Sequence, residues 1–230
     1  MGITVIIPTF NEEKHIQRTV QWLQDTRSDS VKDIIVVDGG SKDRTLALAT
    51  AAGASAIISP KKGRAAQMNH GASLAKTDLL YFVHADVLPP KTWVTDIESA
   101  VQKGLVAGCF SYQFDCDRWY LKITEWATRQ NWFAVGGGDQ TMFVPRQVFE
   151  ELDGFGEELH IMEDFEFVKR LRRKYPFTII CKNATVSARK YEHNNFFYVQ
   201  LVNALTVLFF NMGFPQERLA RIYRNALKVR

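Results

Sequence analysis

The sequence lacks the features that mark multidomain, fibrous or exported proteins. Its 230 residues contain no Ser- or Gly-rich linker, no fixed-period repeat and no low-complexity tract, so we expect a single domain over residues 1–230. A β-branched run follows Met1 and Gly2 directly, which leaves no room for the charged and apolar regions of a signal peptide. Hydrophobic residues make up 46% and charged residues 23%, as is usual for a folded soluble protein.

Cysteine is scarce, and the charge is close to balanced. The three cysteines, Cys109, Cys116 and Cys181, are odd in number and lack metal-site spacing, which indicates reduced thiols and a cytoplasmic location. The formal net charge of +4 suits an anionic substrate or an anionic membrane surface. It is too small to indicate a nucleic-acid partner.

No hydrophobic run is long enough to span a bilayer. The most apolar stretch, residues 196–210, is interrupted by Gln200 and Asn203 and falls short of the roughly 20 apolar residues that a span needs. Two interpretations of this helix stay open. It packs on the domain or on a partner subunit, which favours a homodimer, or it lies in a membrane interface beside the basic segment 218–230, which would place the protein peripherally at the inner face of a membrane.

Glycine-rich phosphate loops are also missing after the first apolar run, residues 3–7. The next residues read Pro8-Thr9-Phe10-Asn11-Glu12, without the glycines that let a dinucleotide approach a helix. No P-loop sequence is present either. These absences disfavour nicotinamide and flavin enzymes and exclude P-loop enzymes. They also weaken the case for a nucleotidyltransferase, which would need a basic Gly-rich loop at this point.

What the sequence does contain is an alternation of apolar runs and amphipathic segments. Continuous runs at residues 3–7, 34–37 and 56–58 are separated by helical patterns, which predicts an α/β fold with a parallel sheet covered on both faces. Asn11 is the expected N-cap of the first helix. Four of the five tryptophans lie between residues 93 and 132, and we expect them to be core residues.

The run at residues 79–83 ends in His84-Ala85-Asp86 and is followed by two prolines, which predicts a central strand that stops at the carboxyl edge of the sheet. Open α/β sheets bind ligands at this edge, where a second carboxylate, Asp38, also lies. Asp86 either caps the helix that begins near Lys91 or binds a divalent cation.

Three further segments carry chemistry, each with a plainer alternative. The basic turn at residues 61–69 is a phosphate site or a solvated loop. The glycines at 136–138 allow close approach of a ligand, or form a flexible loop. Three acidic residues lie in the first turn of a predicted helix, Glu163, Asp164 and Glu166. Either they interact favourably with the helix dipole, or one of them is a general base.

Taken together, these motifs resemble the inverting family 2 glycosyltransferases of the GT-A fold, and within them a small bacterial subfamily. Five motifs occur in the family's order between Ile3 and about Arg189, and they read VIIPTFNE at 5–12, VVDGGSKD at 36–43, GRAAQMN at 63–69, HAD at 84–86 and MED at 162–164. The resemblance implies a GT-A (nucleotide-diphospho-sugar transferase) fold. In that fold a mostly parallel central sheet carries helices on both faces, followed by C-terminal helices. It divides the chain into a nucleotide-sugar-binding half (1–115), an acceptor and catalytic half (116–190) and a C-terminal helical segment (191–230).

By position, the resemblance implies a donor site formed by Pro8, Thr9, Glu12, Asp38, Gly63, Arg64, Gln67, His84, Ala85, Asp86 and Arg189. Gly138, Asp139 and Gln140 match the segment near the donor sugar and acceptor, and Asp164, beside Glu163, matches the catalytic base. The family's Asp-x-Asp motif has His84 in its first position here, so Asp86 is the implied ligand of Mg²⁺ or Mn²⁺.

The implied reaction moves a sugar from a nucleoside-diphosphate sugar to an acceptor hydroxyl with inversion. The metal and nearby cations offset charge on the departing diphosphate, while a carboxylate deprotonates the acceptor. The acceptor stays unidentified, with a saccharide or a lipid-linked molecule as candidates. The substitution by His84 also leaves open a non-catalytic nucleotide-sugar-binding or scaffold protein.

Overall fold

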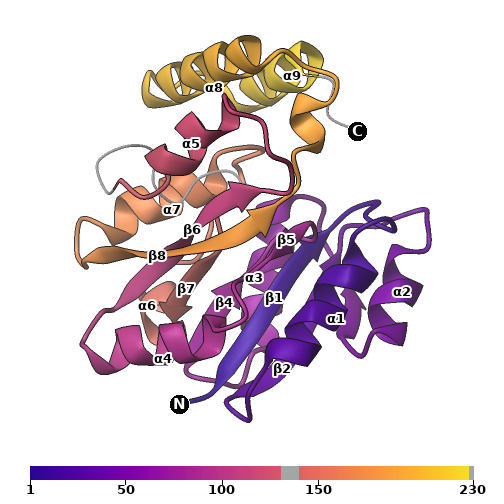
Figure 1. Cartoon of the computed structure of the whole chain (residues 1–230), viewed down its shortest axis with the longest axis vertical. Helices are drawn as coiled ribbons and strands as arrows, with labels where there is room; N and C mark the ends of the chain where they lie inside the picture. Colours follow the sequence, from indigo (N-terminus) through magenta and orange to yellow (C-terminus); the bar gives the residue numbers. More distant parts are fainter. Residues whose placement is uncertain (131–139, 228–230) are drawn as a thin grey trace.

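Eight strands form one sheet in the order β3-β2-β1-β4-β7-β6-β8-β5 in the computed structural model, which describes residues 1–130 and 140–227 (Figure 1). The strands are β1 (Ile3–Thr9), β2 (Val31–Asp38), β3 (Ser55–Ile58), β4 (Leu79–Phe82), β5 (Val87–Leu88), β6 (Ala107–Phe114), β7 (Met142–Pro145) and β8 (Phe177–Val186). The order places β4, the predicted central strand, between β1 and β7 in the interior of the sheet.

The two halves of the sheet differ in strand direction. β1 pairs in parallel with β2 and β4, and β2 pairs in parallel with β3, as the continuous apolar runs predict. In the other half β7 runs antiparallel to β4 and β6, β8 is parallel to β6, and β5 is antiparallel to β8. The expectation of a mostly parallel sheet therefore describes the N-terminal half, and the C-terminal half is mixed.

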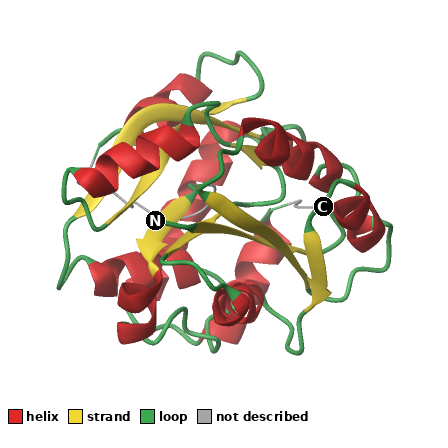
Figure 2. Ribbon diagram, turned by 90° about the horizontal axis from the view of Figure 1, so that it is seen from below, coloured by secondary structure: helices red, strands yellow, loops and turns green. Residues whose placement is uncertain are grey.

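Helices cover both faces of the sheet (Figure 2). They are α1 (Ile16–Thr26), α2 (Thr45–Ala51), α3 (Arg64–Leu74), α4 (Trp93–Gln102), α5 (Leu121–Ala127), α6 (Arg146–Glu151), α7 (Glu163–Leu171), the 3-10 turn η1 (Arg189–Tyr191), α8 (Phe196–Asn211) and α9 (Gln216–Ala226). Side chains alternate across β1, so that Val5 and Ile7 join the core with α1 and α4 while Ile6 joins the core with α3, α6 and α7.

The sheet curls so that its last strand returns to the middle of the molecule. Only Val83–Asp86 connects β4 to β5, yet β7, β6 and β8 lie between them in the strand order. The connection can be this short only because the curled sheet brings β5 back beside α1, which it contacts. His84 and Asp86 both lie on this connection.

Three local expectations are wrong. The prolines after Leu88 do not prevent pairing, since Val87–Leu88 forms the edge strand β5. Asn11 does not cap α1, which begins at Ile16, because Asn11 adopts a left-handed conformation with φ of 55°. Of the tryptophans, Trp93 is buried and stacks on Tyr81 at 5.0 Å, but Trp119 and Trp126 are 73% and 59% exposed; Trp132 lies outside the described residues.

The C-terminal helices lie against the β6–β8 side of the domain, at the top of Figure 1. α8 buries Phe196, Val199, Val202 and Thr206 and leaves its other face exposed. Within residues 1–130 and 140–227, the structure has no helix with the length and apolar character that crossing a membrane requires. All three cysteines are free thiols.

Candidate functional site

The carboxyl ends of β1, β2 and β4 meet at one edge of the sheet and position the first group of polar side chains. Thr9, the last residue of β1, is in register with Asp38, the last residue of β2. The Thr9 hydroxyl lies 3.4 Å from an Asp38 carboxylate oxygen, and both residues are buried. The edge predicted from the strand pattern is therefore where these two side chains face each other.

Asp38 organises the turn that follows its own strand. One of its carboxylate oxygens accepts hydrogen bonds from the backbone N–H groups of Gly40 and Ser41 at 2.9 and 2.8 Å. The other accepts from the Ser41 hydroxyl. Gly40 has a φ of 92°, a conformation that L side chains rarely adopt, so glycine is needed in this turn.

Gln67 ties helix α3 to the same edge. Its side-chain amide donates to the carbonyl oxygens of Thr9 at 2.6 Å and Val37 at 2.8 Å, and the side chain is buried. It therefore satisfies the backbone at the ends of both strands. This contact also fixes the N-terminus of α3, and with it Gly63 and Arg64, next to the strand ends.

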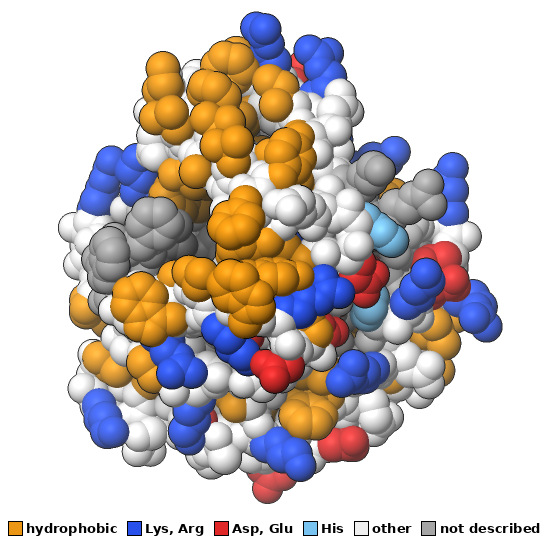
Figure 3. All heavy atoms as spheres, turned by 45° about the horizontal axis from the view of Figure 1, so that its top comes forward, with side chains coloured by type: hydrophobic (Ala, Val, Ile, Leu, Met, Phe, Trp, Pro, Cys, Tyr) orange, Lys and Arg blue, Asp and Glu red, His pale blue; other side chains and the backbone are white. Residues whose placement is uncertain are grey.

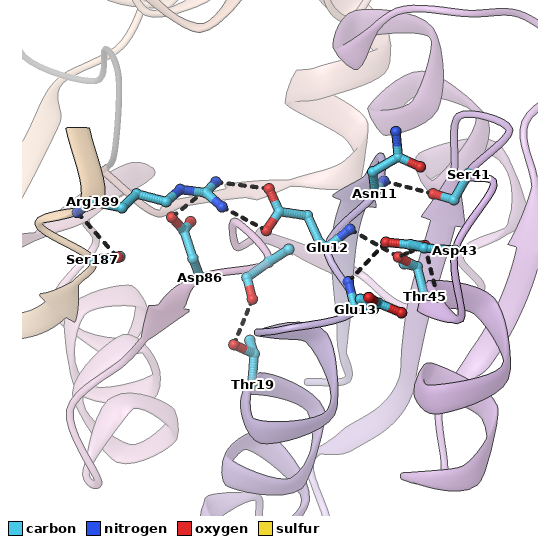
Figure 4. A network of polar contacts seen from close by, with 11 residues as sticks. Asn11, Glu12, Glu13, Thr19, Ser41, Asp43, Thr45, Asp86, Ser187 and Arg189 are labelled. Carbon is cyan, nitrogen blue, oxygen red and sulfur yellow. Dashed lines mark hydrogen bonds and ion pairs between the residues drawn. The ribbon is translucent and has the colours of Figure 1, made fainter. Parts of the chain in front are cut away.

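The loop after β1 is held by side chains of the segment before α2 and of the first residue of α2. The backbone N–H groups of Asn11 and Glu12 donate to the hydroxyls of Ser41 and Thr45, both at 2.8 Å (Figure 4). These N–H groups are thus already bonded within the protein and do not form a phosphate cradle. Sequence reasoning assigned no role to Ser41 or Thr45, although both lie in or beside the 36–43 motif.

Arg189 lies between two carboxylates at the centre of the site (Figure 4). Its guanidinium donates to both oxygens of Glu12, at 2.9 and 2.7 Å, and lies 3.2 Å from a carboxylate oxygen of Asp86. The side chains of Glu12 and Asp86 are each only 15% exposed. A two-pronged arginine–carboxylate contact of this kind is strong and geometrically specific.

The strand register explains why residues so distant in sequence meet here. Val87, which follows Asp86, pairs with Val186 at the end of β8, and Arg189 comes three residues later. The exposed Asp115 holds this turn, since it accepts from the Ala188 N–H at 2.9 Å and donates its own N–H to the Val186 carbonyl at 3.0 Å. Sequence reasoning missed Asp115, whose role depends on the pairing of β5 with β8.

A second ion-pair group joins helices α3 and α7, and it lies near the first because His84, two residues before Asp86, affects the pKa of Glu163. Arg64, at the start of α3, donates through Nε to Glu163, and its terminal nitrogen lies 3.4 Å from a carboxylate oxygen of Asp164. Met162 precedes α7 in a left-handed conformation, with φ of 68°. The first two of the three acidic residues in the first turn of α7, Glu163 and Asp164, contact Arg64, whereas Glu166 pairs with Arg170.

The two carboxylates differ in environment. The side chain of Glu163 is 1% exposed and that of Asp164 is 13% exposed. Burial raises the pKa of Glu163, but the charge and hydrogen bond of Arg64 outweigh burial, and His84 adds to the same effect, so the pKa lies below the ordinary value of 4.5. Glu163 is therefore an anion at neutral pH that pairs with Arg64, and it lies close enough to His84 for the charge of the imidazole to affect its pKa.

The remaining predicted residues lie along the same edge where the structure describes them. Pro8 is within β1 beside Val37, and the Ala85 carbonyl accepts from Thr19 of α1 at 2.7 Å. Gln140 is buried two residues before Met142, which pairs with Phe82 at the end of β4. Its side chain lies 3.4 Å from the Thr128 carbonyl. Gly138 and Asp139 lie outside the described residues.

The donor set at Asp86 suits a metal only in company with a substrate. In residues 1–130 and 140–227, no three His, Cys, Asp or Glu side chains gather into a metal-binding cluster. Mg²⁺ often binds through one or two carboxylates together with substrate phosphates and water. Asp86, a single carboxylate at a strand end, fits that mode, whereas a site built from protein ligands alone does not fit these residues.

The family can be assigned by comparison. The model of glycosyl transferase family 2 matches residues 4–156, which contain both strand-end carboxylates and the start of α3. The chain belongs to glycosyl transferase family 2. The match ends before Glu163 and Arg189. Among curated proteins, the glucosyl-3-phosphoglycerate synthase of Mycolicibacterium smegmatis is 27% identical over 96 residues, which are 38% of this chain and 32% of that protein.

Solved structures show the fold of this family 2 member to be that of GT-A glycosyltransferases. A mannosyltransferase from Pyrobaculum calidifontis, in complex with GDP-Man and Mn²⁺, superposes with a TM-score of 0.71 at 15% identity over 91% of this chain and 63% of its own. S. aureus TarS superposes with a TM-score of 0.66 at 16% sequence identity, over 92% of this chain and 40% of the TarS chain. The chain thus spans about a third of the curated relative and two fifths of TarS.

Proposed function

We propose that this protein is an inverting glycosyltransferase that moves a sugar from a nucleoside-diphosphate sugar to an acceptor hydroxyl. One observation carries the proposal. In a family 2 chain, an Asp86–Arg189–Glu12 group lies beyond the ends of β1 and β4, and an Arg64–Glu163–Asp164 group lies close enough to it for His84 to affect the pKa of Glu163. An anionic leaving group needs cations, a proton acceptor needs a carboxylate, and these two groups offer both.

The nucleoside would lie over the ends of β1 and β2. Thr9 and Asp38 form the buried floor there, and Gln67 holds the two strands together. Asp38 would receive the base in addition to the turn it already binds, since a carboxylate has about four acceptor positions. A glucosyl-3-phosphoglycerate synthase structure from Mycobacterium tuberculosis holds UDP with Mn²⁺ and phosphoglyceric acid, which supports uridine as the first base to test.

Asp86 would hold Mg²⁺ or Mn²⁺ together with the diphosphate, as the donor set at this strand end allows. The bound metal would stabilise negative charge on the departing diphosphate. Arg189 lies beside Asp86 and Glu12, and Arg64 pairs with Glu163, whose pKa His84 affects, so both cations would stabilise the same charge. Arg189 must then exchange a carboxylate for a phosphate oxygen, and its planar guanidinium suits either partner.

Asp164 is the better candidate for the base. Glu163 is the more buried of the two carboxylates and is bonded directly to Arg64, which lowers its pKa and makes it a poor proton acceptor. Asp164 is more exposed and lies farther from the guanidinium, at 3.4 Å. We therefore assign Glu163 to positioning Arg64 and Asp164 to accepting the proton of the acceptor hydroxyl.

The acceptor side would be formed by Gly138, Asp139 and Gln140, of which the structure describes Gln140. Its position before β7 supports an acceptor, saccharide or lipid-linked, that enters over the end of β4. The three free thiols suit a reducing compartment such as the cytoplasm. No observation on the described residues favours a nucleotidyltransferase, because the loop after β1 has already used its N–H groups.

The test compares Asp164→Asn with Glu163→Gln and a control, Asp29→Asn, which changes an exposed aspartate before β2, at the opposite edge of the sheet. Hydrolysis and transfer are measured on a panel of UDP- and GDP-sugars with Mn²⁺, and nucleotide binding by calorimetry. We expect Asp164→Asn to lower turnover by about 100-fold or more, with nucleotide affinity within about twofold of the wild type. The control should match the wild type in both assays.

Two results would contradict the proposal. Undiminished turnover in Asp164→Asn would exclude that residue as the base. A wild-type protein that binds UDP or GDP tightly but turns over no donor in the panel would instead support the nucleotide-sugar-binding or scaffold function, which His84 leaves open.

A further inference from the structure

Helices α5, α8 and α9 share an exposed apolar surface that lies outside the site described above. Figure 3 shows hydrophobic side chains gathered along the upper and central part of this face, with basic side chains at its edges. We name it the α8 face, and its large exposed hydrophobic members are Trp119, Ile123, Trp126, Phe197, Tyr198, Leu201, Leu205, Leu208, Met212 and Ile222. Monomeric soluble proteins rarely expose a contiguous apolar group of this size unless it binds something.

Helix α8 supplies the long axis of the α8 face. Its 16 residues include no charged side chain, and they form a rod about 24 Å long. One stripe packs on the domain through Val199 and Val202, while the opposite stripe exposes Phe197, Leu201 and Leu208 by 67%, 56% and 52%. The spacing of the exposed residues is that of one helical face, so they lie in line.

The arrangement is held in place on both sides of α8. Gln200 donates to the Thr124 hydroxyl of α5 at 3.4 Å and to the Tyr191 hydroxyl at 3.2 Å. Lys190 donates to Asn203 of α8 and to the Tyr223 hydroxyl of α9, at 3.3 and 2.6 Å. The apolar residues are thus displayed on a rigid support of three tied helices.

We propose that the α8 face docks on the surface of an anionic lipid bilayer. Its composition matches that partner, since exposed tryptophans and a tyrosine favour the boundary between headgroups and acyl chains, and the leucines of α8 can enter the acyl region. The charge agrees. Helix α9 exposes Arg218, Arg221 and Arg224 against a single acidic residue, Glu217. Basic residues beside an apolar face add attraction to anionic headgroups.

The same charges argue against a second copy of this chain as the occupant. Two copies that docked through the α8 face by twofold symmetry would each bring the arginine-rich α9 to the shared interface, where like charges repel. An anionic bilayer instead complements them. The docking is interfacial, because α8 is shorter than the roughly 20 residues that a membrane-spanning helix needs.

Docking in this way would bring the candidate site to the membrane. Arg189 and Lys190 are neighbours in η1, and Lys190 holds α8 and α9. At the other end of α8, Phe210 packs edge-on against Phe165 of α7, 6.0 Å between ring centroids, next to Asp164. An acceptor hydroxyl carried by a lipid would therefore arrive on the side of the domain that holds the proposed base.

The test is sedimentation with vesicles of phosphatidylcholine alone and of phosphatidylcholine with phosphatidylglycerol. We expect the wild type to bind the anionic vesicles at low salt, to bind neutral vesicles more weakly, and to be partly released at high salt. Leu201→Gln/Leu208→Gln should weaken binding by about tenfold or more, because two exposed leucines lose their burial in lipid. Arg218→Gln/Arg221→Gln/Arg224→Gln should remove the preference for anionic vesicles.

Leu74→Gln is the matched control, since Leu74 is 46% exposed at the end of α3 and lies outside the α8 face. It should bind vesicles as the wild type does. The proposal is overturned if the wild type does not sediment with anionic vesicles, or if the leucine double variant binds unchanged. It is also overturned if light scattering finds a wild-type dimer that the double variant converts to a monomer, which would make the α8 face a subunit interface. None of these measurements depends on sugar transfer.

Discussion

Arg189 and Asp86 form an ion pair, 3.2 Å between nitrogen and oxygen, at the position where we propose that a metal and a diphosphate bind. The guanidinium also binds both oxygens of Glu12. In this arrangement the cationic side chain neutralises the carboxylate that would otherwise receive the metal. Metal binding and nucleotide binding should therefore depend on Arg189 in opposite directions.

The first prediction follows from this competition. In Arg189→Ala, the affinity for Mn²⁺ measured at saturating UDP should rise by about threefold to fivefold, because Asp86 loses a partly exposed ion-pair partner. The affinity for UDP in the presence of Mn²⁺ should fall by about tenfold or more, because a charged hydrogen bond to phosphate is lost. Calorimetry measures both affinities, and the affinities of Arg189→Lys should lie between those of Arg189→Ala and the wild type. Two affinities that fall together would show that Arg189 only stabilises the fold.

The second prediction uses His15 as a reporter of Arg189. Burial lowers the pKa of His15 below 6.5, and the positive charge of Arg189 lowers it further, against an opposing effect of Glu12. In Arg189→Ala the pKa of His15 should therefore rise, since the repulsion is removed while the Glu12 carboxylate remains. NMR titration of the histidine ring protons measures this change, and His70 on α3 serves as an internal control. An unchanged His15 pKa would mean that Arg189 does not lie beside it in solution.

The third prediction concerns the Arg64–Glu163 pair. Arg64→Met keeps much of the side-chain bulk but leaves the buried Glu163 carboxylate without its cation. This change should lower the free energy of unfolding by about 2–3 kcal/mol at neutral pH. The loss is smaller than the cost of breaking a fully buried pair because the Arg64 side chain is 38% exposed. Arg64→Met/Glu163→Gln should recover part of the loss. Urea unfolding monitored by fluorescence measures both.

The stability difference between the wild type and Arg64→Met should depend on pH through the ionisation of Glu163. In the wild type the pKa of Glu163 lies below 4.5, so the pair contributes stability above that pH and loses it as the pH falls through the folded-state pKa. Without Arg64, burial should raise the pKa of Glu163 above 4.5. The difference in stability between wild type and Arg64→Met should then be largest at neutral pH. It should shrink as the pH falls from the raised pKa of Glu163 in the variant, above 4.5, to its lowered pKa in the wild type, below 4.5. A difference independent of pH would assign the loss to packing.

The sequence predicts the position of a residue well where its place along a strand decides that position. Continuous apolar runs predict parallel strands, and parallel strands end at one edge, so Asp38 and Asp86 could be placed there without coordinates. The contact between Asp86 and Arg189 could not be foreseen, because it depends on the curl that returns β5 to β8. No local pattern in the sequence specifies that pairing.

The wrong local expectations, for the start of α1 and for the tryptophans, also concern features that depend on contacts between residues distant in sequence. Helix α1 begins at Ile16 because the preceding N–H groups, from Asn11 to Glu13, are bonded by the segment before α2. Trp119 and Trp126 were expected in the core because tryptophan is usually buried. Residue type alone does not indicate that Trp119, just before α5, and Trp126, within α5, are exposed.

The fourth prediction tests whether Asp115 acts through Arg189. Asp115 accepts from the Ala188 N–H at 2.9 Å and so fixes the turn from which the Arg189 side chain extends. Asp115→Ala should weaken binding of UDP with Mn²⁺ by about threefold to tenfold, less than Arg189→Ala, because the arginine is present but less well positioned. The double variant should bind no more weakly than Arg189→Ala alone, since residues that act through one contact are not additive. Effects that add in the double variant would instead give Asp115 a separate contribution to binding.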